Sequence, residues 1–382
     1  MQSICGVEGV EAGGLKEGKF GLALIRASGN AAAVFTSNRV RAAPVLLMEE
    51  RIRRGRLEAI AANSGCANGY TGKQGLADAE RMAEIAGTAL SVSPVDIGIA
   101  STGVIGRYLD LSLIEQQCAR VVPLLTGTLA AEQAAAAAIM TTDTRQKHAL
   151  VQKEGFSVGG ICKGSGMIAP NMGTMLAFVF TDAEIAPPVL REALRAASRR
   201  SFNRVVVDEM STNDVLFCIA TGTRGKIGIR EFQPALEDCC RSLAKQVAAD
   251  GEGATKMLEV RVTGAPDEES AADVAKTIIS SPLVKTAVYG EDPNWGRVVA
   301  AAGRAGVRFS PDTISLWIGE GASRTSLIRE GEITADLARA KAAMHGGRVV
   351  FELDLAAGKE EATAWGCDLT EGYVEINGRY TT

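Results

Sequence analysis

Stretches typical of strands and stretches typical of helices are mixed along the whole of this 382-residue chain. Residues 19–27, "KFGLALIRA", and 31–38, "AAAVFTSN", are predicted to be strands joined by a Ser-Gly-Asn turn at 28–30. Residues 73–92 place apolar side chains at helical spacing. Because strands and helices do not alternate strictly, the pattern predicts an α/β (α+β) fold with several antiparallel hairpins.

A second series of elements continues this mixed pattern. Strands are predicted at 96–103, 174–181, 204–208 and 215–221. One helix is predicted to contain the alanine run 134–138 and to end at "TTDT". A second begins near the prolines at 187–188, and a third covers 230–249. The glycine-rich stretch "DGEGATK" at 250–256 then separates these elements from "MLEVRVTG". We therefore predict a domain boundary there, with domains at 1–255 and 256–382.

The charge and the apolar pattern exclude some partners. A formal net charge of −4 gives no electrostatic reason to expect a nucleic acid or an anionic membrane surface as partner. No stretch approaches about 18 uninterrupted apolar residues, and the N-terminus lacks the basic head and apolar centre of a signal peptide. The 8 cysteines include no CxxC pair, which favours buried thiols over disulfides. We therefore expect a cytoplasmic protein.

Histidine chemistry has little support in this sequence. The chain has 2 histidines, His148 and His345, and neither lies in a recognisable motif. A Ser-His-Asp or Cys-His site needs one of them, and a histidine-rich zinc site needs more than two. We interpret both as ordinary surface or core residues. If the chain is an enzyme, its general base is therefore a group other than histidine.

The stretch "KGSGMIAPNMGTMLAFVF" at 163–180 joins an uncharged, glycine-rich loop to an apolar strand. Its "GSGMIA" fits a loose nucleotide-binding pattern, which works only where the glycines open a helix. Pro170 and Gly173 follow too soon for a useful helix, so we reject nucleotide binding. An ordinary glycine-rich hairpin before a core strand is one remaining interpretation.

The other remaining interpretation is chemical. The hydroxyl of Thr174 could attack the Gly173 carbonyl, and hydrolysis of the resulting ester would make Thr174 a chain terminus. A free α-amine has a reference pKa of about 7.7–8.0, which suits a base at neutral pH. Thr174 would then carry its own base and need no histidine.

"KGSGMIAPNMGTMLAF" closely resembles the self-cleaving segment of the ornithine acetyltransferase family, the bifunctional glutamate N-acetyltransferases of arginine biosynthesis. Further blocks resemble the family in the family's order, almost from end to end. They are "AAAVFTSNRVRAAPV" (31–45), "ANSGCANGYTG" (62–72), "STGVIG" (101–106), "MTTDT" (140–144), "DGEGATK" (250–256), "EDPNWGRV" (291–298) and the ending "EINGRYTT". Eight blocks in order make the resemblance highly specific.

The resemblance implies an N-terminal-nucleophile-like fold, an αββα sandwich with an additional C-terminal α/β domain. It also implies self-cleavage between Gly173 and Thr174 into an alpha chain, 1–173, and a beta chain, 174–382, assembled as a heterotetramer of two of each. The family usually has alanine before the nucleophile. Because glycine lacks Cβ and leaves its carbonyl more open to attack, we expect cleavage here as well, at a rate that can differ.

The resemblance also implies roles for individual residues. Thr174 would be the nucleophile, and Thr102 and Gly103 of "STGVIG" would form the oxyanion hole. The implied substrate contacts are Thr141, Lys163, Thr174, Glu252, Asn377 and Thr382. Taken without the resemblance, "STGVIG" is a strand-ending turn, Thr141 merely ends its helix and Glu252 is a solvated loop charge. The block "EDPNWGRV" receives no role beyond a structural turn, with Trp295 in the core.

Together these roles predict ping-pong acetyl transfer. Thr174 would attack the acetyl carbonyl of N2-acetylornithine, ornithine would leave, and the amine of glutamate would attack the acetyl-threonine ester. Lys163 suits the α-carboxylate that both substrates share, and Glu252 suits the ammonium of ornithine. No metal or cofactor is required, water must be excluded, and acetyl-CoA stays open as a second donor. The alternatives are an amidase or aminopeptidase of the same fold, or a small-molecule binder that never cleaves.

Overall fold

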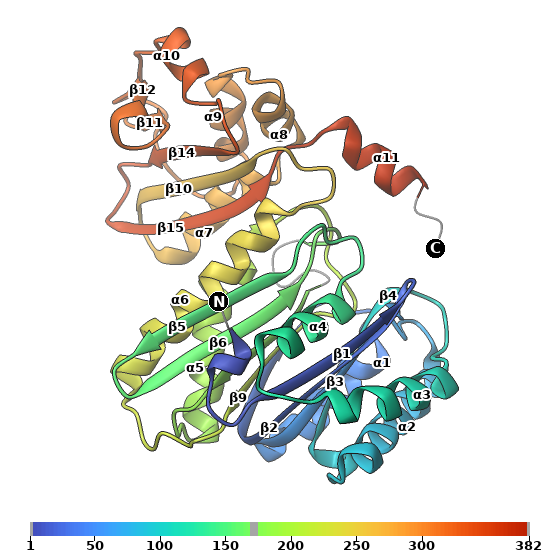
Figure 1. Cartoon of the computed structure of the whole chain (residues 1–382). Coiled ribbons are helices and arrows are strands. Elements are labelled where there is room, and N and C mark those ends of the chain that lie inside the picture. The colour runs from blue at the N-terminus through green and yellow to red at the C-terminus, as the bar shows by residue number, and fades with distance from the viewer. Residues whose placement is uncertain (1–2, 169–174, 380–382) are drawn as a thin grey trace. The chain divides into compact units, whose positions relative to one another are not determined.

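The structure is a computed structural model that describes residues 3–168 and 175–379. The described chain forms two compact units, coloured from blue to red along the sequence in Figure 1. Unit 1 comprises residues up to 203 together with 210–243, and unit 2 comprises 204–209 and 244–379. The change of unit lies inside helix α6, ahead of the glycine-rich stretch at 250–256 where we predicted the domain boundary.

Unit 1 is built on an eight-stranded sheet in the order β4-β3-β2-β9-β7-β6-β5, with β1 paired to β2 outside this path. Its strands are β1 (Glu11–Glu17), β2 (Phe20–Phe35), β3 (Arg56–Cys66), β4 (Ile97–Val104), β5 (Lys147–Lys153), β6 (Phe156–Lys163), β7 (Leu176–Thr181) and β9 (Val215–Ala220). Its helices are α1 (Ala43–Arg51), α2 (Gly72–Leu90), α3 (Leu111–Val121), α4 (Leu129–Ile139), α5 (Pro187–Arg199) and the first part of α6 (Ile229–Ala249).

The hairpin that we predicted at residues 19–38 is wrong. Phe20–Phe35 form one strand of 16 residues, β2, and its pairing with β3 is irregular between Arg26 and Gly29, within the Ser-Gly-Asn segment. A Cβ on Gly29 would lie 2.0 Å from the Ala220 carbonyl oxygen, so glycine is required here for close approach to β9 rather than for a turn. Asn30 fixes the segment further by donating to the Ile185 carbonyl at 2.9 Å.

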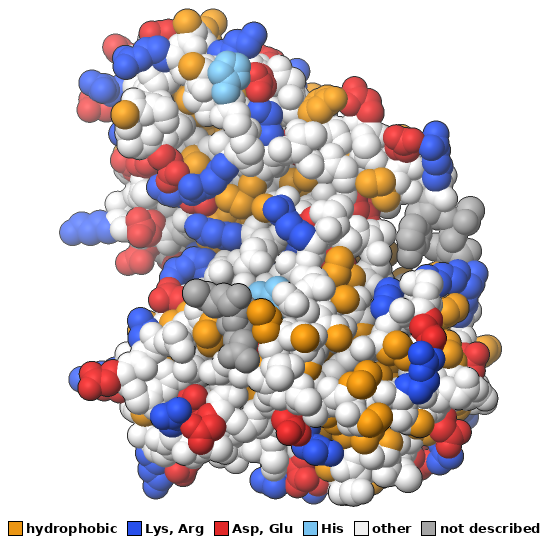
Figure 2. Space-filling model, viewed as in Figure 1, with side chains coloured by type: hydrophobic (Ala, Val, Ile, Leu, Met, Phe, Trp, Pro, Cys, Tyr) orange, Lys and Arg blue, Asp and Glu red, His pale blue; other side chains and the backbone are white. Residues whose placement is uncertain are grey.

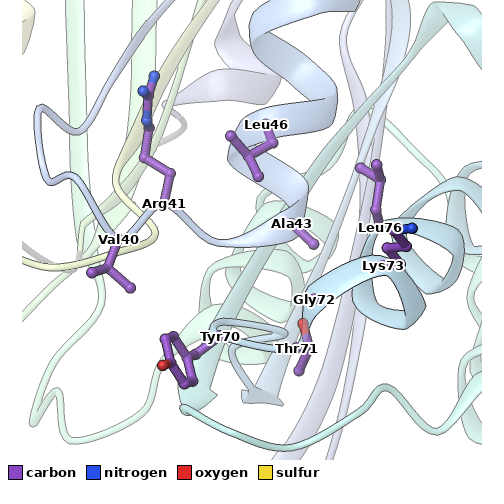
Figure 3. A pocket seen from close by; sticks show the side chains of 9 residues that line it. All are labelled: Val40, Arg41, Ala43, Leu46, Tyr70, Thr71, Gly72, Lys73 and Leu76. Carbon is purple, nitrogen blue, oxygen red and sulfur yellow. The ribbon is translucent and has the colours of Figure 1, made fainter.

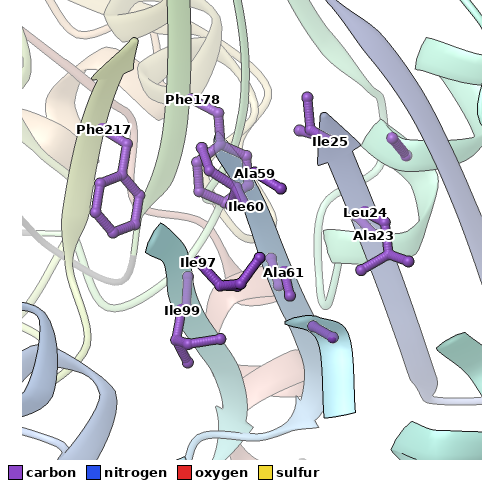
Figure 4. Close-up of a cluster of buried hydrophobic side chains, with 14 of the residues drawn as sticks. Ala23, Leu24, Ile25, Ala59, Ile60, Ala61, Ile97, Ile99, Phe178 and Phe217 are labelled. Atoms are coloured by element: carbon purple, nitrogen blue, oxygen red, sulfur yellow. The ribbon is translucent and has the colours of Figure 1, made fainter. Parts of the chain in front are cut away.

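The two halves of the unit 1 sheet face one another. Thr102 of β4 and Lys163 of β6 are about five strand spacings, or roughly 24 Å, apart along the sheet order. Their side chains nevertheless form a 3.2 Å hydrogen bond, so the sheet must fold over on itself through β2. Side chains from both halves enter one core, including Ile60, Phe178 and Phe217 (Figure 4). The predicted fold class, with two facing sheet layers, is confirmed.

Helix α4 packs directly on the backbones of β1 and β2. A Cβ added to Gly14 would lie 2.3 Å from the Ala134 carbonyl oxygen, and one added to Gly21 would lie 2.2 Å from that of Ala138. Two glycines on the strands therefore allow the alanine-rich helix to approach closely. This packing fixes the end of α4, which leads into the block "MTTDT".

Most other predicted elements are confirmed. The helices expected at 73–92, through 134–138, from 187 and over 230–249 correspond to α2, α4, α5 and α6, and the strands expected at 96–103 and 215–221 to β4 and β9. The strand predicted at 174–181 is described from Met175 and begins as β7 at Leu176. The strand predicted at 204–208 is reduced to Val205–Val206, strand β8.

Unit 2 contains a seven-stranded sheet in the order β13-β12-β11-β14-β10-β15-β8. Its strands are β8, β10 (Met257–Ala265), β11 (Ser315–Ile318), β12 (Thr325–Arg329), β13 (Glu332–Ile333), β14 (Arg348–Asp354) and β15 (Glu360–Cys367). Its helices are α7 (Glu268–Ile279), α8 (Pro282–Tyr289), α9 (Trp295–Gly303), α10 (Leu337–Ala342) and α11 (Glu371–Arg379). Helix α7 contacts β10 and β15, and Trp295 packs against the core at the start of α9.

The thiols and the surface agree with the composition. Seven of the 8 cysteines are buried, as predicted, and Cys5 is half-buried. On the face seen in Figure 2, basic and acidic side chains are interspersed. Within residues 3–168 and 175–379, no helix is long and apolar enough to cross a membrane.

Candidate active site

The end of β4 carries the predicted oxyanion pair. Thr102 is fully buried, and its Oγ1 accepts a hydrogen bond from Lys163 Nζ at 3.2 Å. Gly103 has φ +128°, and a Cβ there would lie 2.4 Å from the Gly65 carbonyl carbon on β3. Only glycine fits both the backbone angle and the space. The sequence "STGV" therefore places a buried hydroxyl beside a glycine whose backbone packs closely against β3, at one strand end.

Asp143 connects several of the predicted residues. Its Oδ1 accepts from Lys147 Nζ at 2.7 Å and from the backbone N–H of Gly164 at 2.6 Å. Its Oδ2 accepts from the backbone N–H of Thr141 at 3.1 Å. Thr141 and the residue after Lys163 are thus bound to one buried carboxylate. Thr141 follows α4, as predicted, and its backbone is held in addition by the hydrogen bond to Asp143.

Lys16 is a further cation of this region. It lies on β1, and its Nζ donates to Ser64 Oγ at 2.7 Å and to the Met140 carbonyl at 2.6 Å. Ser64 pairs with Thr102 across β3 and β4, and Met140 precedes Thr141. Lys16 therefore joins the strand end that carries Thr102 to the segment that carries Thr141.

We call Lys16, Lys147, Lys163 and Asp143 the lysine cluster. Burial, and then the charge of Lys163, lower the pKa of Lys16, while Asp143 opposes that shift. Burial acts to raise the pKa of Asp143, but Lys163 and Lys147 outweigh it, so the net pKa of this carboxyl is below its ordinary value. Three ammonium groups here meet the Asp143 carboxylate and the Asp214 carboxyl group, on which Lys163 also acts. Positive charges therefore outnumber negative ones, which suits a carboxylate ligand.

The start of β7 lies beside this cluster. Lys163 is the register partner of Leu176 in the antiparallel β6–β7 pair. The backbone N–H of Met175 donates to Asp214 Oδ1 at 2.9 Å, and Asp214 immediately precedes β9. Gly173 and Thr174, the predicted cleavage residues, lie outside the described residues, as does the substrate contact predicted at Thr382.

In unit 2 the structure brings together the two other predicted substrate contacts. The Asn377 side-chain amide donates to Glu252 Oε2 at 2.8 Å. Glu252 is 9% exposed, so it is not the solvated loop charge that its sequence context alone suggested. A Cβ on Gly253 would lie 2.4 Å from the backbone nitrogen of Tyr373 in α11, so the glycine-rich stretch packs closely against the helix that carries Asn377.

Sequence reasoning missed four residues of this region, namely Lys16, Asp143, Lys147 and Asp214. Asp143 was inside a quoted block, "MTTDT", and a carboxylate beside a predicted substrate contact was an available signal. Lys147 lies four residues after its ion-pair partner Asp143. The other two depend on long-range contacts: Lys16 meets Ser64 and Met140, and Asp214 meets Met175. No spacing pattern indicates such contacts.

The histidines have structural contacts, as we interpreted them. His148 Nδ1 lies 3.0 Å from Ser3 Oγ, and its Nε2 lies 3.1 Å from the Gln146 side-chain oxygen. His345 is exposed, with Nδ1 at 2.6 Å from a Glu291 carboxylate oxygen. In the described part of the chain no three His, Cys, Asp or Glu side chains are grouped as metal ligands would be.

A surface pocket of about 570 Å³ lies elsewhere in unit 1 (Figure 3). Apolar Val40, Leu46 and Leu76 line it together with Tyr70, which is 80% exposed. None of the predicted site residues lines this pocket, so we assign it no part in the chemistry.

Comparison with known proteins finds relatives along nearly the whole chain. The ArgJ family model matches residues 7–382. Glutamate N-acetyltransferase of Methanosarcina mazei is 49% identical over 99% of this chain and 98% of its own length. The arginine biosynthesis bifunctional protein ArgJ of Archaeoglobus fulgidus is 43% identical over 99% of this chain and 100% of its own.

Among solved structures, that of the arginine biosynthesis bifunctional protein ArgJ from Bacillus halodurans is 41% identical with a TM-score of 0.51. The match covers 53% of this chain and 98% of the solved chain. The family model and the relatives extend over nearly the whole sequence. The chain belongs to the ArgJ family.

Proposed function

We propose that this acyltransferase moves an acetyl group from N2-acetylornithine to glutamate by a ping-pong mechanism in arginine biosynthesis. One observation carries the proposal: the buried Lys163 ammonium lies 3.2 Å from the Thr102 hydroxyl, at the strand end that also carries Gly103. The contact puts a carboxylate-binding cation beside a group suited to an oxyanion. Family membership supports the choice of substrates.

Thr174 is the proposed nucleophile. Its α-amine removes the hydroxyl proton, and the oxygen attacks the acetyl carbonyl of the donor. The Thr102 hydroxyl and a Gly103 backbone N–H stabilise the negative charge that develops on the carbonyl oxygen. The proton passes to the departing amine of ornithine. Glutamate then attacks the acetyl ester with the same groups acting in reverse.

The proposed cleavage lies between Gly173 and Thr174 and yields chains 1–173 and 174–382. The Bacillus halodurans structure supports this cleavage. Its solved chain matches over 98% of its own length but covers 53% of this chain, and residues 174–382 are a similar share of the sequence. We further propose a heterotetramer of two chains of each kind in the cytoplasm. A second proposed activity, with acetyl-CoA as the acetyl donor to glutamate, is tested by supplying acetyl-CoA in place of acetylornithine.

Substrate binding is assigned by charge. The positive lysine cluster favours the α-carboxylate that both substrates share, and Lys163 and Thr141 are its proposed contacts. Glu252, held by Asn377, is the proposed partner for the ammonium of ornithine. Thr382 keeps its proposed role from the family resemblance alone.

Intact mass spectrometry and product analysis test this function together. Purified wild-type protein should consist of the two chains, and Thr174→Ala should leave one uncut chain without transferase activity because no hydroxyl remains. Acetylornithine alone should give an acetylated chain that begins at residue 174, and glutamate should discharge it as N-acetylglutamate.

Two results would contradict the proposal. Free acetate as the main product at saturating glutamate would indicate an amidase. Wild-type protein that stays uncut and yet transfers acetyl at full rate would exclude self-cleavage as the source of the nucleophile.

A further inference from the structure

A small pocket lies at the end of β3, apart from the proposed substrate contacts. Its volume is about 150 Å³, and its lining comes from the start of β2, the end of β3 and the segment from Arg107 into α3. Of the predicted site residues that the structure describes, none lines this pocket. A water molecule takes about 30 Å³ of liquid and a cavity of about 150 Å³ can hold benzene, so the pocket has room for a small organic ligand.

Asn63 gives the pocket a buried hydrogen-bond acceptor. Its side chain is 4% exposed, and its Nδ2 donates to the Cys66 carbonyl at 2.9 Å. Over residues 3–168 and 175–379, no group donates a hydrogen bond to its Oδ1, which is itself buried. Turning the amide over would bring its oxygen against the Cys66 carbonyl, so this orientation is the favourable one. Because a buried acceptor without a donor is unfavourable, Asn63 Oδ1 indicates a ligand with an N–H or O–H group.

Two residues of opposite charge also line the pocket. Arg107 is exposed, and its side chain has no ion-pair partner among the described residues. Burial raises the pKa of the Cys66 thiol, against the Asn68 N–H and the Arg107 charge, which lower it, so the guanidinium lies near the pocket wall. Asp110 is exposed too, and its Oδ1 accepts the Leu113 N–H at 3.0 Å. A carboxylate can accept several hydrogen bonds, so Asp110 can also accept one from a ligand.

We propose that this pocket binds a small α-amino acid in its zwitterionic form. The ligand carboxylate pairs with the Arg107 guanidinium, whose planar N–H groups suit a carboxylate. The ligand ammonium donates to Asn63 Oδ1 and to Asp110, and a short side chain contacts Phe20 and Ile114. One cation beside one carboxylate suits a zwitterion better than a doubly charged phosphate, which the carboxylate would repel.

The pocket is distinct from the lysine cluster, although it adjoins the strand that carries Thr102. None of the four cluster residues, all of which the structure describes, lines it. Gly65, which does line it, pairs with Gly103 in the parallel β3–β4 register. The ligand would therefore lie against the strand next to the proposed oxyanion pair. The inference goes beyond the proposed function and does not depend on it, because a binding measurement tests it.

Isothermal titration calorimetry of the purified protein with L-alanine tests the site. L-alanine matches the pocket in size and carries both charged groups, whereas propionate and ethylamine each lack one of them. The variants are Arg107→Ala, Arg107→Lys and Leu113→Trp, the last of which fills the pocket from α3. The control is Arg81→Ala, because Arg81 is an exposed arginine of α2 that pairs with Glu84 at the surface.

We expect L-alanine to bind the wild type with a Kd of about 1 mM or below. Propionate and ethylamine should bind at least about 10-fold more weakly, because each loses one charged hydrogen bond. Arg107→Ala should weaken L-alanine binding at least about 10-fold, Arg107→Lys should weaken it less because the charge is kept, and Arg81→Ala should change it less than about 2-fold. Leu113→Trp should abolish binding, and circular dichroism checks that each variant is folded.

Three results would overturn the inference. No binding of L-alanine up to about 50 mM would leave water as the occupant of the pocket and the partner of Asn63. Unchanged binding in both Arg107→Ala and a folded Leu113→Trp would place L-alanine elsewhere, and if the tryptophan variant does not fold, Arg107→Ala against Arg81→Ala decides alone. Propionate that binds as tightly as L-alanine, or inorganic phosphate that binds more tightly, would indicate an anion site that does not recognise amino acids.

Discussion

The lysine cluster of unit 1 and the Glu252–Asn377 pair of unit 2 are constructed in different ways. Lys163 meets Thr102 from a strand that is distant in the sheet order, and both side chains are buried. Glu252 lies in a loop and is held by an exposed residue of the terminal helix α11. The first group depends on the folding of the whole sheet, and the second on the docking of one helix.

This difference separates two kinds of expected effect. A change in the lysine cluster removes a charge from a dry interior, where its partners cannot turn to water, so it should affect stability and both half-reactions. In the Glu252–Asn377 pair Glu252 is buried but its partner Asn377 is exposed and can turn to water, so a change there should affect one substrate and disturb the fold less.

The largest effect is expected for Asp143→Asn. The substitution leaves Lys147, whose side chain is fully buried, without its 2.7 Å ion-pair partner. Breaking a buried pair in this way costs about 3–5 kcal/mol. The free energy of unfolding, from urea titration, should fall by that amount. Adding Lys147→Met should restore part of it, and a single variant as stable as wild type would show that the cluster contributes nothing to folding.

The same carboxyl group predicts a pH dependence. The pKa of Asp143 in the fold is below its ordinary value of 3.8, so its contribution to stability is present above that value and is lost as the pH falls through the folded pKa. Wild-type protein should therefore lose stability on acidification below about pH 4 more steeply than the Asp143→Asn, Lys147→Met double variant.

The sequence predicted the local elements of both units better than the contacts between them. Helical spacing identified α2 and α6, and apolar runs identified β4 and β9, because these patterns depend on residues that are near in sequence. The Ser-Gly-Asn segment was misassigned because glycine there serves approach to Ala220, almost two hundred residues away, and not a turn. The same reason hid Lys16 and Asp214.

The quoted blocks located the candidate site, but not its organisation. "STGVIG" and "KGSG" supplied Thr102 and Lys163, yet their contact exists only because the sheet folds over through β2. Thr141 and Lys163 were each assigned by resemblance, and Asp143 is the physical link between their segments. Charges that are matched across a fold leave no periodic signal in the sequence.

A somewhat smaller effect is expected for Thr102→Ala. The change removes a proposed oxyanion donor, so kcat should fall about 10²–10³-fold while KM changes little. The control is Ser101→Ala on the same strand, because the buried Ser101 hydroxyl has no hydrogen-bond partner among the described residues. An unchanged kcat in Thr102→Ala would exclude the hydroxyl from the oxyanion hole.

The smallest and most selective effect is expected for Glu252→Ala. Removing one carboxylate that is held by a single 2.8 Å amide contact should weaken the acetylornithine half-reaction about 10-fold, since the ammonium of ornithine loses its proposed partner. The glutamate half-reaction, whose substrate carries no side-chain ammonium, should change less than about 3-fold. Rapid-quench kinetics of each half-reaction measure these effects separately. The control is Glu375→Ala on the exposed face of α11, because the ion pair of Glu375 with Arg379 lies at the surface. Equal losses in both half-reactions would show that Glu252 supports the general shape of the site, and the contrast between a unit that positions the chemistry and a unit that selects the substrate would then fail.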